Sequence, residues 1–242
     1  MDVLPLNAVH IDLLHTANAD AQSRLDAYRA LMSADEHERM ARFAFERDRR
    51  AFVMTRALVR TTLSRYASIA AADWRFIANV HGRPEILDRP PGVPDLRFNL
   101  SHTDGLIACA VTVGRDIGVD VEHTGRHLTH DVAARHFAPS EVAALNALSA
   151  GDQQKVFFDY WTLKESYIKA RGFGLALPLS DFAFKLNPPH APSISFEPVL
   201  DDDPDSWQFL QDWPTPQHRL ALAVRRTGRD LPVRIREVVP QA

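Results

Sequence analysis

Two long segments of the chain carry apolar residues at the spacing of an α-helix. Residues 47–66 contain neither Gly nor Pro, and their apolar residues recur four positions apart, which is typical of an amphipathic helix. A second long helix is predicted from Asp152, as its N-cap, to Arg171, with Gly172 in the position that ends it. Four shorter helices are predicted. One covers residues 20–32, one lies around residues 129–137, and one begins at Ser140 behind Pro139. Another begins at Ser33, whose spacing to Glu36 has the form of a capping box.

Short runs of apolar or alternating residues between the helices predict strands. They cover residues 8–14, 74–77, 97–100, 106–113, 117–121, 182–186, 194–199, 207–213, 220–224 and 233–238. Gly114, Arg115 and Asp116 have the composition of a tight turn, so the strands on either side of them are expected to form a hairpin. Helices clustered apart from hairpin-connected strands indicate the α+β class and not a doubly wound parallel sheet.

The composition is that of an ordinary water-soluble globular protein. The chain has 242 residues, of which 45% are hydrophobic, enough to bury a core without disulfides or metal staples. Its single cysteine, Cys109, cannot form an internal disulfide. With 28 Lys and Arg against 31 Asp and Glu, the net charge of −3 argues against a general nucleic-acid-binding protein. Neither a signal peptide nor a stretch of about 18 apolar residues is found, so we expect a cytoplasmic protein that does not enter the membrane.

One predicted strand ends in two carboxylates, in the sequence IGVDVE at residues 117–122. Because residues two apart in a strand face the same side, Asp120 and Glu122 project together. Two carboxylates so close repel each other and are costly to desolvate, and a divalent cation such as Mg²⁺ would remove that cost. The hexapeptide alone favours a plainer interpretation, in which the pair lies at a strand end in water.

The second long helix carries a stripe of three functional side chains. Trp161, Glu165 and Lys169 follow one another at intervals of four residues, so they lie along one face. Apolar neighbours indicate that the helix is largely covered. Glu165 and Lys169 are compatible with a simple surface ion pair, and equally with a third metal-binding oxygen and a phosphate contact.

Other candidate residues lie in the first half of the chain. Ser101 and His102 end a strand and are suited to bind a phosphate, to orient a nucleophile or to cap a turn. A serine hydrolase is not indicated, because no Gly-x-Ser-x-Gly sequence surrounds Ser101. Arg83 lies in a Gly-Arg-Pro turn. Five arginines lie close together in the sequence: Arg39, Arg42, Arg47, Arg49 and Arg50. They form either a solvated basic face or a site for several phosphates.

The order and spacing of these motifs resemble the 4′-phosphopantetheinyl transferase superfamily. The matching segments are GRP at 82–84, FNLSH at 98–102, GVDVE at 118–122 and WTLKESYIKARG at 161–172. In its length and N-terminal half the chain is similar to the larger, Sfp-type members and not to the short, trimeric holo-acyl-carrier-protein synthases. The resemblance extends over residues 47–179 and fades beyond them.

The resemblance implies a reaction and a role for each candidate. Family members transfer the phosphopantetheine arm of coenzyme A (CoA) to a serine hydroxyl of an apo acyl or peptidyl carrier protein and release adenosine 3′,5′-bisphosphate. Attack on a charged diphosphate by a neutral hydroxyl requires a metal ion and cationic contacts. By resemblance, Asp120, Glu122 and Glu165 bind Mg²⁺, for which Mn²⁺ can substitute. The residues implied to bind CoA are Arg42, Arg50, Arg83, Ser101, His102, Asp120, Lys164, Glu165 and Lys169.

Two residues are implied to be catalytic. Glu165 takes the serine proton, directly or through a metal-bound water. Lys169 neutralises charge on the transferred or leaving phosphate, assisted by Lys164. Ser101, His102 and Arg83 then contact the nucleotide end of CoA. The candidates for its 3′-phosphate are Arg39, Arg42 and Arg50.

The resemblance also implies an architecture. It consists of two similar α+β halves, residues 1–114 and 115–242, related by pseudo-twofold symmetry, with the active site in the cleft between them and a monomeric state. A CoA- or carrier-binding module without catalysis would be favoured by loss of one of the three carboxylates, all of which are present. A magnesium-dependent phosphohydrolase fits the carboxylates but not the lysines of the helix.

A mixed apolar and basic stretch after Glu122 is predicted to dock the carrier protein. The alternative is a helix whose Val132 and Phe137 pack inward. The stretch comprises His123, Arg126, His127, Leu128, Val132, Arg135, His136 and Phe137.

Overall fold

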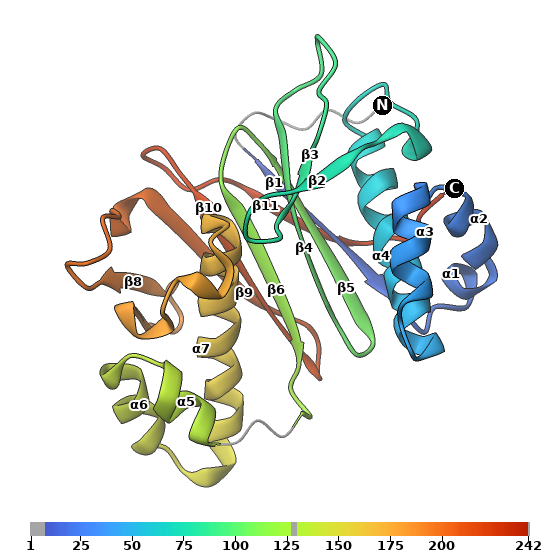
Figure 1. Ribbon diagram of the computed structural model, residues 1–242. Helices are drawn as coiled ribbons and strands as arrows, with labels where there is room; N and C mark the ends of the chain where they lie inside the picture. Colours follow the sequence, from blue (N-terminus) through green and yellow to red (C-terminus); the bar gives the residue numbers. More distant parts are fainter. Residues whose placement is uncertain (1–7, 127–129, 242) are drawn as a thin grey trace. The chain divides into compact units, whose positions relative to one another are not determined.

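The structure is a computed structural model that describes residues 8–126 and 130–241 (Figure 1). The mixture of helices and sheets confirms the predicted α+β class. The chain divides into two units, one residue away from the boundary predicted after residue 114: unit 1 comprises Met1–Arg115 and Leu231–Ala242, and unit 2 comprises Asp116–Asp230. The prediction that the second half continues to residue 242 is wrong, because the last strand pairs with the first strand of the chain.

Unit 1 contains a four-stranded sheet and the helices α1 to α4. Its strands are β1 (Val9–His15), β2 (Phe76–Ala78), β3 (Pro84–Ile86), β4 (Leu96–Thr103), β5 (Leu106–Val113) and β11 (Val233–Glu237); its helices are α1 (Ala19–Ser23), α2 (Leu25–Ala30), α3 (Ala34–Ala41) and α4 (Glu46–Ser64). The sheet has the order β11-β1-β5-β4, with β11 parallel to β1 and the other pairs antiparallel, while β2 and β3 form a separate hairpin. Helix α4 lies where the helical spacing predicted it and packs against β1, β4 and β5.

Two local predictions for unit 1 are wrong. The helix predicted over residues 20–32 is divided at Arg24, whose φ of −100° and ψ of 7° separate α1 from α2. The hairpin predicted around Gly114 does not form, because β5 hydrogen-bonds β1 on one side and β4 on the other and has no free edge. By contrast, the predicted capping box of α3 is confirmed, since the Glu36 carboxylate accepts from the Ser33 amide at 3.0 Å.

A buried carboxylate fastens the C-terminal strand to unit 1. Asp12 on β1 has no exposed surface, and β11 places Arg236 opposite it. Arg236 Nε donates to Asp12 Oδ1 at 2.6 Å, and Thr62 and Arg65 from the α4 side bind the other carboxylate oxygen. Every charge of this group is paired, which is the condition for burying a carboxylate at acceptable cost.

Unit 2 contains a three-stranded sheet with the long helix α7 on one face. Its strands are β6 (Ile117–His123), β7 (Phe182–Lys185), β8 (Ser193–Phe196), β9 (Trp207–Thr215) and β10 (His218–Arg225); its helices are α5 (His130–His136), α6 (Pro139–Asn146) and α7 (Ala150–Arg171). The antiparallel sheet has the order β6-β10-β9, and β7 pairs with β8. Figure 1 shows α7 lying along β6, β9 and β10, the strands that it packs against. No helix of the described residues is long and apolar enough to span a membrane.

Helix α7 begins two residues earlier than predicted and ends as predicted. Ser149 is its N-cap, and Asp152 lies in the first turn, where it accepts from the Ser149 hydroxyl at 2.7 Å. At the other end Gly172 has φ 69°, a left-handed conformation that glycine adopts without strain.

Candidate active site

Strand β6 and helix α7 approach each other so closely that only glycine fits between them at position 118. A Cβ atom at Gly118 would overlap the Ser166 carbonyl oxygen and the Ala170 amide nitrogen. Because side chains alternate along a strand, Asp120 and Glu122 lie on the same, α7-facing side as Gly118. The missing side chain at Gly118 therefore brings both carboxylates against α7.

The stripe predicted on α7 meets these carboxylates. Trp161, Glu165 and Lys169 are half-buried, whereas the residues that separate them on the helix are buried. Lys169 Nζ lies 2.6 Å from Asp120 Oδ1, and Trp161 Nε1 donates to a carboxylate oxygen of Glu122 at 3.3 Å. The structure thus brings together the four acidic and basic residues predicted for the reaction centre in this unit.

Charges of one sign accumulate at this position. Burial, followed by the charges of Asp120 and Glu122, raises the pKa of Glu165 to about 7, although Lys169 opposes the shift. Burial and the charge of Asp120 also raise the pKa of Glu122. Arg126, which lies 3.0 Å from the Glu122 oxygen that Trp161 does not contact, opposes this shift. In the described part of the chain no side chain donates a hydrogen bond to Glu165. The neighbouring carboxylate charges therefore lie close enough to disfavour the ionised forms of Glu122 and Glu165.

This set of oxygen donors fits a hard divalent cation such as Mg²⁺, which would neutralise the accumulated negative charge. Among residues 8–126 and 130–241, no three His, Cys, Asp or Glu side chains already stand in a metal-binding arrangement. Asp120 is instead paired with Lys169. Binding of a metal ion by Asp120, Glu122 and Glu165 stays a prediction.

The predicted phosphate contact of Lys164 is wrong. This side chain has no exposed surface, and its ammonium lies 2.7 Å from Glu141 of α6 and donates to the carbonyls of Leu179 and Phe182 at 2.7 Å each. Three acceptors satisfy its three N–H groups. Lys164 therefore holds α7 to neighbouring elements of unit 2, away from the stripe.

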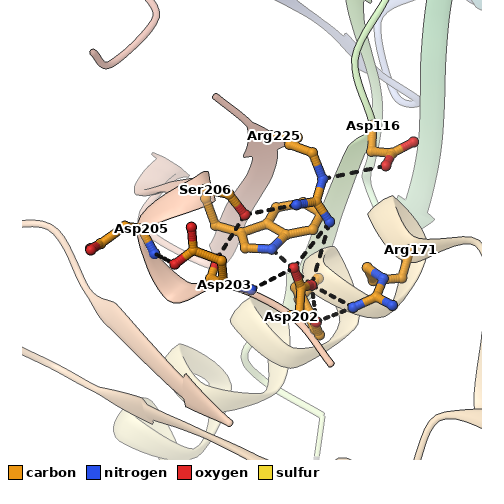
Figure 2. A network of polar contacts seen from close by, with 9 residues as sticks. Asp116, Arg171, Asp202, Asp203, Asp205, Ser206 and Arg225 are labelled. Carbon is orange, nitrogen blue, oxygen red and sulfur yellow. Dashed lines mark hydrogen bonds and ion pairs between the residues drawn. The ribbon is translucent and has the colours of Figure 1, made fainter. Parts of the chain in front are cut away.

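The C-terminal end of α7 is fixed by a second buried carboxylate, Asp202 (Figure 2). Tyr167 donates to it at 2.7 Å and Arg171 is ion-paired with it, both from the last turns of α7. Trp207 of β9 donates at 3.0 Å, and Arg225 of β10 at 3.1 Å. Burial alone would raise the pKa of Asp202, but these hydrogen bonds and the two arginine charges hold it below its usual range. The network keeps the helix turn that carries Lys169 in register with the sheet.

The candidates for the nucleotide end of CoA are dispersed over unit 1. Ser101 and His102 are neighbours on β4, so they point to opposite faces, and Ser101 is buried whereas His102 is exposed. Arg83 donates to Glu85 at 2.8 Å beside the β2–β3 hairpin. Arg42 and Arg50 are exposed at the end of α3 and on α4. Their roles toward CoA stay predictions.

Comparisons with known proteins show the family to which the chain belongs. A family model described as "4′-phosphopantetheinyl transferase superfamily" matches residues 116–224, and one described as "4′-phosphopantetheinyl transferase, N-terminal" matches residues 19–113. Over 210 residues the chain is 34% identical to the 4′-phosphopantetheinyl transferase HetI of Nostoc sp.. This alignment covers 86% of this chain and 84% of that protein. The chain belongs to the 4′-phosphopantetheinyl transferase superfamily. It is also 32% identical to the 4′-phosphopantetheinyl transferase Sfp of Bacillus subtilis over 167 residues, 69% of this chain and 72% of that protein.

The family assignment confirms the resemblance and the enzyme class predicted from the motifs.

The predicted carrier-docking stretch is tested in part by the structure. Phe137 is buried and stacks on Phe157 with 5.3 Å between ring centroids, so the inward-packing alternative is correct for this residue. Arg126, Arg135 and His136 are exposed. His127 and Leu128 lie outside the described residues.

Sequence reasoning missed the residues that hold the helix of the candidate site, α7, to the neighbouring elements of unit 2. Asp202 lies in an acidic run, residues 201–203, that has the composition of a solvated loop. Only the structure shows that its side chain is buried against partners on α7, β9 and β10. Glu141 lies in the first turn of α6, and no sequence pattern distinguishes it from other acidic residues at a helix start. A signal was present in the sequence, because Lys164 falls outside the four-residue spacing of the stripe and must therefore face the interior.

Proposed function

We propose that the chain transfers the 4′-phosphopantetheine arm of CoA to a serine hydroxyl of an apo acyl or peptidyl carrier protein. The arrangement of Glu165 and Lys169 on one face of α7, opposite Asp120 and Glu122 on β6, carries the proposal, in a chain that belongs to the transferase family. The serine Oγ forms a bond to the phosphorus that bears the arm. The bond from this phosphorus to the bridging oxygen breaks, and adenosine 3′,5′-bisphosphate leaves.

In this proposal Asp120, Glu122 and Glu165 hold Mg²⁺, or Mn²⁺ in its place. The bound ion supplies charge neutralisation for the diphosphate. Glu165 takes the serine proton, because its half-buried carboxylate receives no hydrogen bond from any described side chain. The protein is proposed to act as a cytoplasmic monomer.

Lys169 has two successive partners in this mechanism. It first pairs with Asp120, at 2.6 Å, and so keeps the carboxylate site partly neutralised. With Asp120 holding the metal ion, the Lys169 ammonium would contact the phosphate that is transferred or leaves. The nucleotide end of CoA is assigned to Arg83, Ser101 and His102, with Arg42 and Arg50 as candidates for the 3′-phosphate.

The test is incubation of the protein with an apo carrier protein, CoA and Mg²⁺, followed by intact-mass measurement of the carrier. We expect the carrier to gain the mass of one phosphopantetheine arm. Asp120→Ala and Glu165→Ala should each slow the transfer by about 100-fold or more, as expected when charge stabilisation is removed from a reaction centre. Glu197→Ala, which removes an exposed carboxylate elsewhere in unit 2, is the matched control. Release of inorganic phosphate without modification of the carrier would contradict the proposal, as would near-normal transfer by either active-site variant.

A further inference from the structure

A pocket of about 650 Å³ opens in unit 2 directly beyond Glu122. Three segments form it: residues 123–125 after β6, the first turns of α7, and the end of β9 with the turn that leads into β10. Its lining includes the indole of Trp213, the ring of Pro216 and the ammonium of Lys155. Of the described residues that line it, none is a carboxylate.

The positive charge at this pocket is available to a ligand. Lys155 is exposed, its Nζ lies 5.3 Å from the centroid of Trp213, and no carboxylate of the described residues lies within ion-pair distance of it. Arg219 also lies against Trp213, at 5.1 Å, but its charge is compensated by Asp159, whose Oδ1 is 2.6 Å from Arg219 Nε. The indole therefore forms an apolar wall beside the exposed ammonium group of Lys155.

The pocket wall is held to the reaction centre. Gln154 Nε2 donates to the carbonyls of Thr124 at 2.7 Å and Arg126 at 3.3 Å, which ties the segment after β6 to α7. Arg126 in turn pairs with Glu122, a proposed metal ligand, at 3.0 Å. Lys155 precedes Glu165 by ten residues on the same helix, or roughly 15 Å along its axis. A macromolecule that reacts at Glu165 can therefore extend over the pocket.

The chemistry of the lining distinguishes between the two substrates. The phosphates of CoA are assigned above to Lys169 and to residues of unit 1. The pantetheine arm that remains is uncharged and offers no partner to the Lys155 ammonium. An acidic protein surface with one projecting apolar side chain matches both the ammonium and the indole. Tryptophan in a pocket beside a charged rim is also the composition typical of an energetically dominant contact in protein interfaces.

We propose that this pocket anchors the protein substrate: an apolar side chain enters against Trp213 while a neighbouring carboxylate pairs with Lys155. The inference rests on the proposed transferase function and names the surface by which the carrier is recognised. It extends the docking stretch predicted from the sequence to the start of α7 and the β9–β10 turn, and it does not involve Phe137, which is buried.

The experiment compares Trp213→Ala, Lys155→Glu and the control Lys185→Glu, which reverses an exposed charge on β7. Transfer rates are measured with the carrier varied at saturating CoA, and with CoA varied at saturating carrier. We expect the carrier KM to rise about tenfold for Trp213→Ala, the size of a strong interface contact. It should rise several-fold for Lys155→Glu, and more at low ionic strength than at high. For Trp213→Ala and Lys155→Glu the KM for CoA and the kcat should be unchanged. For the control Lys185→Glu both KM values and the kcat should be unchanged.

Direct binding separates this inference from the proposed reaction. Titration of each variant with apo carrier by calorimetry, without CoA, reports the anchor even if no transfer occurs. Lys155→Glu is a surface change that does not depend on how Trp213→Ala folds, so its weaker binding supports the anchor independently. A raised CoA KM with an unchanged carrier KM would overturn the inference and assign the pocket to the pantetheine arm. Unchanged carrier affinity in both variants would also overturn it.

Discussion

Lys169 Nζ on α7 lies 2.6 Å from Asp120 Oδ1 on β6, so the proposed catalytic lysine is paired with a proposed metal ligand. The Asp120 carboxylate is almost fully buried and the lysine side chain is about a quarter exposed, at 5% and 26%. An ammonium group and a divalent cation held by the same carboxylate repel each other. The pair therefore couples metal binding to the position of the lysine.

This coupling predicts opposite effects of Lys169→Met on metal binding and on catalysis. Loss of the competing cation should tighten Mn²⁺ binding roughly fivefold, the equivalent of a partly exposed ion pair of about 1 kcal/mol. Transfer should fall by about 100-fold or more, because the phosphate loses its cationic partner. Titration of Mn²⁺ followed by electron paramagnetic resonance measures the first effect without the reaction. Lys185→Met is the control, and unchanged or weaker Mn²⁺ binding by Lys169→Met would show that the two cations do not compete.

The buried pair of Lys164 and Glu141 makes a prediction that separates support from phosphate binding. Lys164→Met should lower the free energy of unfolding by about 3–5 kcal/mol, because it leaves Glu141 buried and uncompensated. The double variant Lys164→Met/Glu141→Gln removes both charges and should recover at least half of that loss. Urea denaturation measures both. The recovered double variant should bind CoA with the KM of the original protein, whereas a raised KM would return Lys164 to the phosphate site.

Helix and strand periodicity made the local arrangement of the candidate site predictable from the sequence. The four-residue spacing of Trp161, Glu165 and Lys169 and the two-residue spacing of Asp120 and Glu122 each fix one face of one element. The exposure of the α7 stripe and the ion pair to β6 agree with these local rules. Such rules depend only on residues close in the chain.

The larger failures of prediction concern residues distant in the chain. Strand β11 pairs with β1 through Asp12 and Arg236, which are 224 residues apart, and no local pattern indicates this partner. The turn composition around Gly114 was correct, but whether its flanking strands pair depends on the other neighbours of β5. Likewise Trp213 became a candidate only when the fold placed it beside Lys155.

Gly118 makes a prediction about the close contact between β6 and α7. In Gly118→Ala the new methyl group meets backbone atoms of Ser166 and Ala170, which cannot turn aside as a side chain can. We expect a loss of unfolding free energy of about 3 kcal/mol or more, at the upper end for overpacking. Gly151→Ala, where only the Ser149 hydroxyl lies within 4 Å of the new atom, should change stability by no more than about 1 kcal/mol. Thermal unfolding measures both, and equal stabilities would show that β6 can move away from α7 at little cost.

The Asp202 network predicts a stability difference that depends on pH. The groups that face Asp202 are Tyr167 and Arg171 from α7, Trp207 from β9 and Arg225 from β10, and together they hold its pKa below the ordinary value of 3.8. A carboxyl whose pKa is lowered by folding binds its proton more readily in the unfolded chain. Its contribution to stability is therefore complete above pH 3.8 and is lost as the pH falls through the lower folded value.

Asp202→Asn should accordingly be less stable than the original protein by about 1–3 kcal/mol at pH 7, the range for a lost charged hydrogen-bond acceptor. The difference should shrink as the pH falls below 3.8, because protonation then removes the charge of Asp202 from the original protein as well. Asp201→Asn, which alters the exposed neighbouring carboxylate, should differ little from the original protein at either pH. Chemical denaturation at pH 7, 5 and 3 measures the three proteins. A difference that stays constant down to pH 3 would mean that the ionised form of Asp202 gains nothing from Arg171 and Arg225, and that its hydrogen bonds alone hold the end of α7.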